Sequence, residues 1–272
     1  HERSRRQRQM CIRDRDIVKL NNNKNTPQIE FIFDRKNYLI RKSVKLSKQF
    51  HIIASNIDIC FLIITVKNPE TSTMFIDRFL ASTFSYNIDT VLLFNKVDDI
   101  SDKEENTLKT FLATYKSAGY DCLKISGKKG INIDKLKLIM KGKSCVFSGH
   151  SGVGKSTLIN RLDSKINIKT LPISKSNLSG QHTTTFSEMH DLEFGSRIID
   201  TPGIKGFGLF DVSNFELKDF FKEFICVEQC KFNNCLHYNE PGCNVKILVE
   251  NGSISRSRYD NYIQLLEEIQ NS

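Results

Sequence analysis

The chain has 272 residues, of which 39% are hydrophobic and 26% charged, and its formal net charge is +9. This length and balance suit a globular protein with one large domain or two to three small ones. The longest apolar stretch, residues 57–66, contains Asp58 and is too short to cross a bilayer, and the first residues lack the apolar core of a secretory signal. We therefore expect a cytoplasmic protein that does not enter a membrane.

The positive charge favours polyanionic partners, nucleic acid foremost, although a lysine-rich composition alone can also make a protein basic. Residues 1–16 differ from the rest, because they hold six of the thirteen arginines and no lysine. Two interpretations stay open for this stretch: a non-native segment from cloning or gene prediction, or a disordered basic tail. Without it the formal charge is still +6, so the basic character does not depend on it.

Short β-like pieces follow at residues 29–33, 38–40 and 44–46. They are too few to make a domain alone. We interpret residues 17–50 as the C-terminal remnant of a small β-barrel.

Residues 51–212 are predicted to alternate between strands and helices. The expected strands are 59–66, 90–94, 122–125, 144–147, 188–193 and 197–199, and the expected helices are 71–84, 102–118, 131–140 and one from Lys155. This alternation predicts a doubly wound α/β domain. The remaining residues, 213–272, are predicted to form a small helical domain with helices at 215–224 and 258–269 around a cysteine cluster.

A phosphate-binding loop is predicted between the strand 144–147 and the helix that begins at Lys155. The sequence there matches the P-loop pattern G-x-x-x-x-G-K-[ST], with the residues Gly149, His150, Ser151, Gly152, Val153, Gly154, Lys155, Ser156 and Thr157. Glycines let the backbone N–H groups surround the phosphates, and the helix N-terminus adds a favourable field. Lys155 is expected to reach the β- and γ-phosphates, and the Ser156 hydroxyl to ligate Mg²⁺.

Two further segments have the composition of nucleotide-dependent switches. Asp200-Thr-Pro-Gly203 follows a strand, where a carboxylate can hold Mg²⁺ through water and Gly203 can approach the γ-phosphate. The polar stretch that ends in residues 180–185 suits a mobile loop whose threonine closes on Mg²⁺, and we favour Thr184 among residues 183–185. Alone, the first string could be a simple β-turn and the second a plain flexible loop.

Guanine specificity is predicted from the string that directly follows the strand 90–94, which consists of Asn95, Lys96, Val97 and Asp98. The Asp98 carboxylate can accept two hydrogen bonds from guanine N1–H and its 2-amino group, a pair of donors that adenine lacks. Asn95 can pin the neighbouring loops, and the Lys96 stem can cover the base. Ser126-Gly127-Lys128, after another strand, suits the loop behind the base.

These motifs occur in an unusual order. The guanine string comes first, then the base loop, the phosphate loop and the two switches, whereas ordinary GTPases begin with the phosphate loop. The same site can form if the old termini are joined and the chain is opened at a surface loop. The sequence therefore predicts a circularly permuted P-loop GTPase.

The residue after the switch glycine is Ile204, where Ras-type GTPases have a glutamine that orients the attacking water. Unassisted hydrolysis should therefore be slow, and another group must position the water. His182, on the first switch, is our candidate catalytic residue beside Lys155 and Thr184, with a solvent-exposed loop residue as the alternative interpretation.

Four of the eight cysteines (residues 226, 230, 235 and 243) fall within eighteen residues. The pattern Cys230-x₄-Cys235-x-His237-x₅-Cys243 supplies three thiolates and an imidazole, a complete tetrahedral set for one structural Zn²⁺ per chain. Two alternatives stay open, a set in which Cys226 replaces Cys230, and disulfides.

Together these residues resemble the RsgA/YjeQ family of circularly permuted GTPases that depend on the small ribosomal subunit. The resemblance covers about residues 35–270 and rests on six strings: 54–58, 95–98, 149–157, 182–185, 200–203 and 230–243. It implies an N-terminal OB-fold barrel, a GTPase domain and a C-terminal zinc domain, and action late in maturation of the small (30S) ribosomal subunit, with its rRNA as partner. The chain departs from the family at its start, where only about the last thirty residues of the barrel are present.

We therefore expect a monomeric GTPase that uses Mg²⁺ with GTP and GDP and acts as a checkpoint or release factor. Two other functions stay open: a nucleotide-gated RNA-binding scaffold with little hydrolysis, and a permuted GTPase that serves the large subunit.

Overall fold

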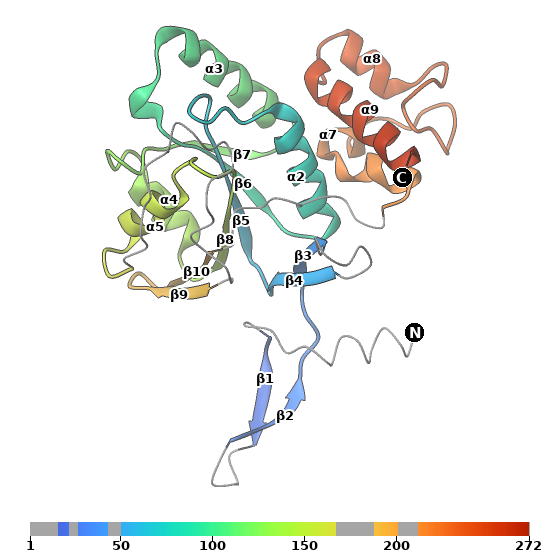
Figure 1. The fold of residues 1–272 in the computed structure, drawn as a ribbon. Coiled ribbons are helices and arrows are strands. Elements are labelled where there is room, and N and C mark those ends of the chain that lie inside the picture. The colour runs from blue at the N-terminus through green and yellow to red at the C-terminus, as the bar shows by residue number, and fades with distance from the viewer. Residues whose placement is uncertain (1–15, 22–26, 43–49, 167–187, 201–211, 272) are drawn as a thin grey trace.

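The computed structural model describes residues 16–21, 27–42, 50–166, 188–200 and 212–271 (Figure 1). Its central element is a six-stranded sheet with the strand order β7-β6-β5-β8-β10-β9. The strands are β5 (Ile59–Ile64), β6 (Thr90–Phe94), β7 (Asp121–Lys124), β8 (Ser144–Ser148), β9 (Glu188–Leu192) and β10 (Ser196–Asp200). All neighbours are parallel except the edge strand β9, which runs antiparallel to β10.

Both faces of the sheet are covered by helices, α2 (Thr73–Ser85) and α3 (Asp102–Ser117) on one side, α4 (Ile133–Met140) and α5 (Lys155–Leu162) on the other. The alternation of side chains along β5 explains this, because Leu62 packs against the α2–α3 layer while Phe61 and Ile63 pack against the α4–α5 layer. Every residue of β5 is buried, as its continuous apolar run requires. The predicted doubly wound α/β fold is confirmed.

The C-terminal module is built differently from the sequence prediction. It contains α6 (Asn214–Leu217), η2 (Lys218–Phe220), α7 (Lys222–Ile225), α8 (Asn244–Glu250) and α9 (Arg256–Gln270). The single helix expected over 215–224 is wrong, because the backbone is extended at Phe221 (φ −104°, ψ 102°). Phe221 is fully buried, with its ring centroid 5.2 Å from that of Tyr262, so tertiary packing overrides a continuous helix there.

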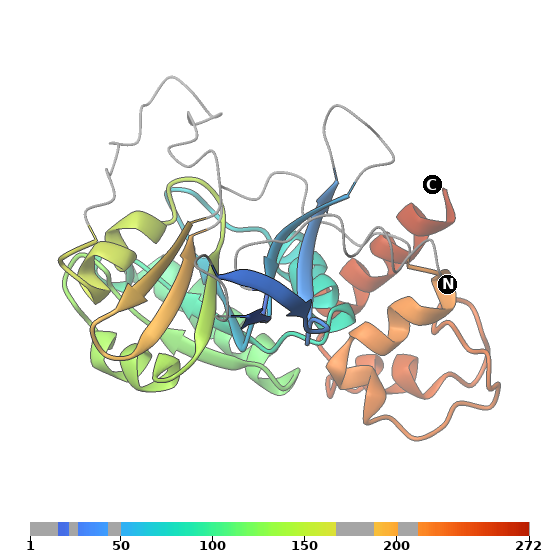
Figure 2. The ribbon, with the colours of Figure 1, turned by 90° about the horizontal axis from the view of Figure 1, so that it is seen from below.

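Helix α2 lies between the sheet and the C-terminal module (Figure 1). Its residues Ile76, Phe79 and Leu80 belong to the hydrophobic core between the sheet and the α2–α3 layer, whereas Ala81 belongs to the core of the C-terminal module. Seen from below, the module stands at one side of the sheet, away from the α4–α5 layer (Figure 2). One amphipathic helix therefore joins the two cores.

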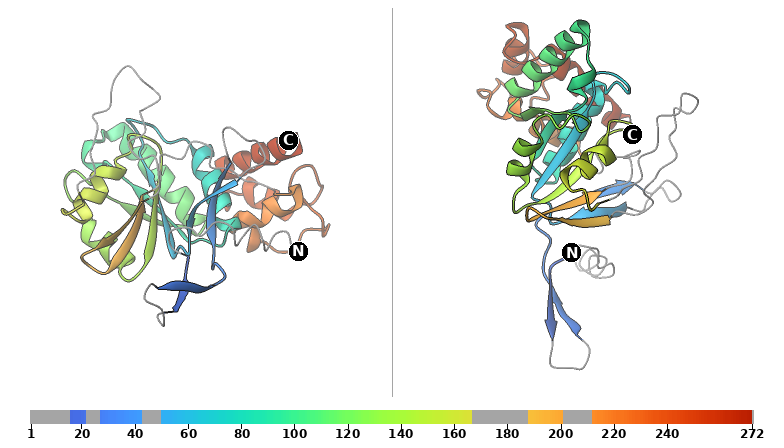
Figure 3. Two further views of the ribbon diagram at one scale, coloured as in Figure 1. Left: turned by 60° about the horizontal axis from the view of Figure 1, so that its bottom comes forward. Right: turned by 90° about the vertical axis from the view of Figure 1, so that its left-hand side faces the viewer.

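Two small hairpins precede the sheet: β1 (Val18–Asn21) pairs with β2 (Gln28–Ile32), and β3 (Tyr38–Lys42) pairs with β4 (Phe50–Ser55). The first projects away from the sheet (Figure 3). It leaves large apolar side chains exposed, among them Leu20, Ile29 and Phe31. Strands were expected at 29–33 and 38–40, and the piece expected at 44–46 lies outside the described residues. Asp16, the first described residue, is paired with Arg35 at 2.6 Å.

In the described parts of the chain, no helix has the length and apolar character that a bilayer crossing needs.

Candidate functional site

The phosphate loop follows β8, a middle strand of the sheet, and ends where α5 begins at Lys155. The loop needs glycine at two places where the backbone is left-handed and crowded. A Cβ on Gly149 (φ 144°) would lie 2.6 Å from the carbonyl oxygen of Ile63, and one on Gly154 (φ 98°) would lie 2.5 Å from the side-chain nitrogen of Asn95. The structure therefore explains both fixed glycines of the P-loop pattern by close approach.

The amino group of Lys155 lies inside this loop, where it donates to the carbonyl oxygens of Gly149 (2.7 Å) and His150 (2.8 Å). The phosphates of a nucleotide held by the loop would attract the same cation. The His150 ring packs against Phe75 of α2, with ring centroids 3.8 Å apart and the ring planes tilted by 33°. Burial, and then the charge of Lys155, lower the pKa of His150. Ser156 follows in the first turn of α5, half-buried, while Ser151 and Thr157 are exposed.

The Asn95 side chain joins three predicted motifs. Its Nδ2 donates to the carbonyl of Val153 in the phosphate loop (2.8 Å), and its Oδ1 accepts from the backbone N–H of Gly127 in the base loop (3.1 Å). Asn95 itself starts the guanine string and is buried. One amide thus holds together segments that lie 32 and 58 residues away along the chain.

The next residue, Lys96, adopts the left-handed conformation (φ 64°), and its amino group donates to the carbonyl of Gly152 (2.7 Å). Burial lowers the pKa of Lys96, opposed by the charges of Asp99 and Asp98. Asp98 lies in η1 (Val97–Asp99), a single 3₁₀ turn, and is partly exposed, as a group that reads a base edge must be. The guanine string and the phosphate loop therefore lie beside each other.

A residue that the sequence did not single out also touches the base loop. Arg161 of α5 donates from Nε to the carbonyl of Gly127 (3.0 Å) and from Nη2 to that of Lys128 (2.6 Å). The partners lie more than thirty residues apart along the chain, and a lone arginine on a helix carries no local signal of such a contact.

The predicted Mg²⁺ and switch residues are only partly described. Asp200 ends β10, and its backbone lies opposite Phe147 of β8, so the chain leaves the sheet beside the phosphate loop. Nothing is described of its side chain. Gly203, His182, Thr184 and the rest of residues 167–187 and 201–211 lie outside the described residues.

A second candidate site lies in the C-terminal module, where Cys230, Cys235, His237 and Cys243 bring their ligand atoms within 4.8 Å of one another. The His237 Nδ1 atom lies 3.6, 3.5 and 3.3 Å from the three sulfurs in that order, and the sulfurs of Cys230 and Cys243 are 3.9 Å apart. A tetrahedral zinc site with ordinary bond lengths has S···N edges of about 3.6 Å and S···S edges of about 3.8 Å. The donor set fits a metal ion such as zinc.

Residues other than the four candidate ligands hold the loop that carries His237 in place. His237 has a left-handed backbone (φ 58°), its carbonyl accepts from the Tyr259 hydroxyl of α9 (2.7 Å), and the Glu240 carboxylate accepts from the backbone N–H groups of Leu236 (2.7 Å) and Tyr238 (2.8 Å). Cys226 is exposed and stands outside this set of ligand atoms. Burial raises the pKa of the Cys235 thiol, and a bound cation would act in the opposite direction by stabilising the thiolate.

A P-loop on a middle strand, with a guanine string that precedes it in the chain but meets it in space, defines a circularly permuted P-loop GTPase. Residues 32–210 match the family described as RsgA GTPase, so the chain belongs to this family and is a GTP-hydrolysing enzyme. The predicted resemblance is confirmed.

Relatives support the same assignment along most of the chain. A protein of Flavobacterium psychrophilum, named Small ribosomal subunit biogenesis GTPase RsgA, is 52% identical over 243 residues, which are 89% of this chain and 74% of the relative. A protein of the same name from Christiangramia forsetii is 55% identical over 243 residues, 89% of this chain and 77% of the relative.

Solved structures agree. YjeQ from Thermotoga maritima is 34% identical, with a TM-score of 0.83 over 98% of this chain and 87% of that one. YloQ, described as a circularly permuted GTPase, is 27% identical, with a TM-score of 0.75 over 94% of this chain and 80% of that one.

Proposed function

We propose that this GTPase acts in late maturation of the small (30S) ribosomal subunit, as a checkpoint or release factor that hydrolyses GTP to GDP and phosphate. The observation that carries the proposal is the Asn95 side chain, which ties the guanine string to both the base loop and the phosphate loop. The names of the relatives indicate the small ribosomal subunit as the particle on which the enzyme acts. Because that subunit is assembled in the bacterial cytoplasm, we propose the same location, with no membrane partner and a monomer as the acting form.

The proposed roles follow the chemistry of each group. Asp98 selects guanine, Lys155 and the loop amides bind the phosphates, and Ser156, Thr184 and Asp200 organise Mg²⁺. When bound, Mg²⁺ neutralises the charge that develops on the phosphates. His182 is proposed to position the attacking water.

The domain boundaries are proposals too. Residues 17–50 would be the end of an OB-fold barrel, 51–212 the GTPase domain and 213–272 the zinc domain, with residues 1–16 as a tail. Exposed apolar side chains on the β1–β2 hairpin support the first of these, since an isolated two-stranded hairpin is only marginally stable and such side chains face a core in a barrel.

The distribution of charge along the chain indicates which parts are expected to contact rRNA. Residues 213–272 carry six lysines and arginines against nine acidic residues, so the basic excess lies entirely in residues 1–212. Phosphate contacts are therefore expected mainly from the GTPase domain and the barrel remnant. Co-sedimentation with separated ribosomal subunits, in GDP and in a non-hydrolysable GTP analogue, tests the proposal. Binding to the large subunit alone would contradict it.

Base specificity is expected to depend on one carboxylate. Asp98→Asn exchanges one acceptor for a donor, which should weaken GTP binding more than about tenfold and favour xanthine nucleotide, because a mismatched hydrogen bond leaves polar groups unpaired. Titration with GDP and XDP measures this, and Asp99→Asn, on the exposed neighbour, is the matched control. Unchanged GDP affinity in Asp98→Asn would remove Asp98 from the site.

Turnover is expected to rise at least about tenfold when small subunits are added, because Ile204 cannot orient water and another group must be ordered first. His182→Ala should abolish this stimulation and leave GDP affinity within a few-fold of the parent. Single-turnover hydrolysis with and without small subunits gives both numbers. An equally stimulated mutant would exclude His182, and an unstimulated parent would favour a nucleotide-gated scaffold.

A further inference from the structure

The base loop that follows β7, residues 126–130, has nearly all of its backbone N–H groups engaged. Ser126 N–H bonds to the carbonyl of Ile131 (3.2 Å), that of Gly127 to Asn95 Oδ1 (3.1 Å), that of Lys129 to Ser126 Oγ (2.9 Å) and that of Gly130 to the Ser126 carbonyl (2.8 Å). The N–H of Lys128 has no partner among the described residues. It is the donor that this loop can offer to a ligand.

The direction of the Lys128 N–H is fixed by the contact that Arg161 makes with the Gly127 carbonyl, because both groups belong to one peptide plane. In a planar trans peptide, the Gly127 carbonyl and the Lys128 N–H point in opposite directions. Arg161 Nε binds this carbonyl at 3.0 Å, so the Lys128 N–H must point away from α5. The second contact, from Nη2 to the Lys128 carbonyl at 2.6 Å, fixes the following peptide as well.

The loop also lies directly on the helix. A Cβ on Gly127 would lie 3.3 Å from the Cα of Leu158, so a larger residue would need the loop or α5 to shift by a few tenths of an ångström. Asn95 holds the other side of Gly127, next to the guanine string. The Lys128 N–H therefore points away from α5, from a loop that Asn95 ties to the guanine string.

We propose that Arg161 is a positioning residue for guanine specificity, which directs the Lys128 N–H toward the 6-oxo group of the base through its two bonds to the base loop. This rests on the proposed guanine site. Guanine has an acceptor at position 6, whereas adenine has an amino group that cannot accept there. Arg161 would thus support recognition of the guanine acceptor at position 6, whereas Asp98 recognises the donors N1–H and the 2-amino group.

The arginine fork is essential to this role. Its planar guanidinium reaches two carbonyls at once, whereas a lysine ammonium is a point donor on a flexible stem. The side chain of Arg161 is exposed, so the bonds contribute at the low end of the range for charged donors, about tenfold in affinity.

The test uses the full chain and three ligands, GDP, IDP and 6-thio-GDP. GDP and IDP share the 6-oxo group, and 6-thio-GDP keeps both donors for Asp98 but replaces that oxygen by the weaker acceptor sulfur. In Arg161→Met we expect GDP and IDP to bind about tenfold more weakly and 6-thio-GDP less than threefold more weakly. Arg161→Lys should resemble Arg161→Met, because charge alone does not restore the fork.

The control is Arg256→Met, which removes an exposed arginine of α9 whose contacts, with Asp260 and the Tyr259 ring, lie within its own helix, and it should leave all three affinities unchanged. Equal weakening of all three ligands in Arg161→Met would mean a general structural role, and no weakening would mean no role; either result overturns the proposal. A parent chain that binds GDP no better than ADP would instead overturn the guanine site on which it rests.

Discussion

Removal of zinc is expected to unfold the C-terminal module while the six-stranded sheet stays folded. Structural zinc sites of this kind contribute on the order of 10 kcal/mol in isolated fingers, more than the roughly 3–5 kcal/mol that the core of so small a domain supplies. Here the predicted ligands Cys235 and Cys243 belong to the module core itself, together with Tyr262 and Leu266 of α9. Losing the ion would leave three thiols and an imidazole inside that core without their common partner.

Hydrogen exchange measured by region can separate the two parts of the chain. After chelation, the amides of α8 and α9 should lose protection, whereas those of β5 and β6 should keep it, because the sheet buries its own apolar layers on both faces. Elemental analysis should find one zinc per chain in the parent. Protection of α9 that survives complete chelation would show that the metal is not structural.

Two cysteine variants define the ligand set. Cys235→Ala should lose the zinc, and Cys226→Ala should retain it, since Cys226 is exposed and stands outside the group of four ligand atoms. Loss of zinc in both variants, or in neither, would mean that the assigned ligands are wrong.

The strands of the sheet could be predicted because their signal is local. β5 and β6 are continuous apolar runs buried on both faces, and the structure ends β5 at Ile64 where the prediction reached residue 66. The phosphate loop is predictable for the same reason, since a contiguous string fixes both its turn and the start of α5. Neither needs information from elsewhere in the chain.

What the sequence could not predict depends on partners far away in the chain. The backbone break at Phe221, the Arg161 contacts and the packing of Phe75 against His150 each bring together segments with no shared pattern. The sequence did not predict helix α8 either, since it has only seven residues and follows directly on the predicted ligand Cys243. The same limit applies to the interface between α2 and α9.

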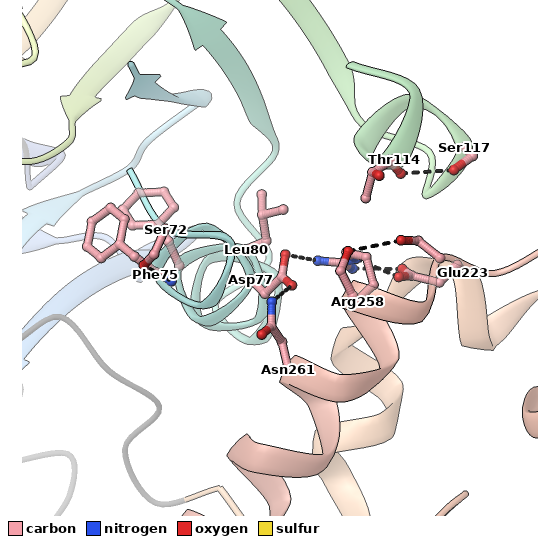
Figure 4. Close-up of polar contacts among 12 residues, drawn as sticks. Ser72, Phe75, Asp77, Leu80, Thr114, Ser117, Glu223, Arg258 and Asn261 are labelled. Carbon is pink, nitrogen blue, oxygen red and sulfur yellow. Dashed lines mark hydrogen bonds and ion pairs between the residues drawn. The ribbon is translucent and has the colours of Figure 1, made fainter. Parts of the chain in front are cut away.

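That interface contains a buried cation between two carboxylates. Arg258 of α9, 1% exposed, donates to Asp77 of α2 (2.6 Å) and through both Nε (2.6 Å) and Nη2 (2.8 Å) to Glu223 (Figure 4). Asn261 donates to the other Asp77 oxygen (2.6 Å), and the Phe221 ring lies 4.7 Å from the guanidinium carbon. Burial alone would lower the pKa of Arg258, but the carboxylates of Asp77 and Glu223 hold it well above its usual value.

Arg258→Met is expected to destabilise the C-terminal module by about 3–5 kcal/mol, because it keeps most of the apolar stem but leaves the buried Asp77 carboxylate without its cation. For a chain of this size, the loss corresponds to a fall of roughly 10 °C in the midpoint of thermal unfolding. Arg256→Met, two residues earlier on the exposed face of α9, should change the midpoint by less than about 2 °C.

A double substitution shows how the destabilisation arises. If the uncompensated carboxylate is responsible, Asp77→Asn combined with Arg258→Met should be less destabilising than the sum of the two single changes, because the amide needs no counter-charge. Additive effects would mean that Arg258 stabilises the interface by pairing with Glu223 or by packing on Phe221 rather than by pairing with Asp77. Since Asp77 and Arg258 lie 181 residues apart, at the junction of the two cores, the same variants report how firmly the module is attached to the nucleotide-binding domain.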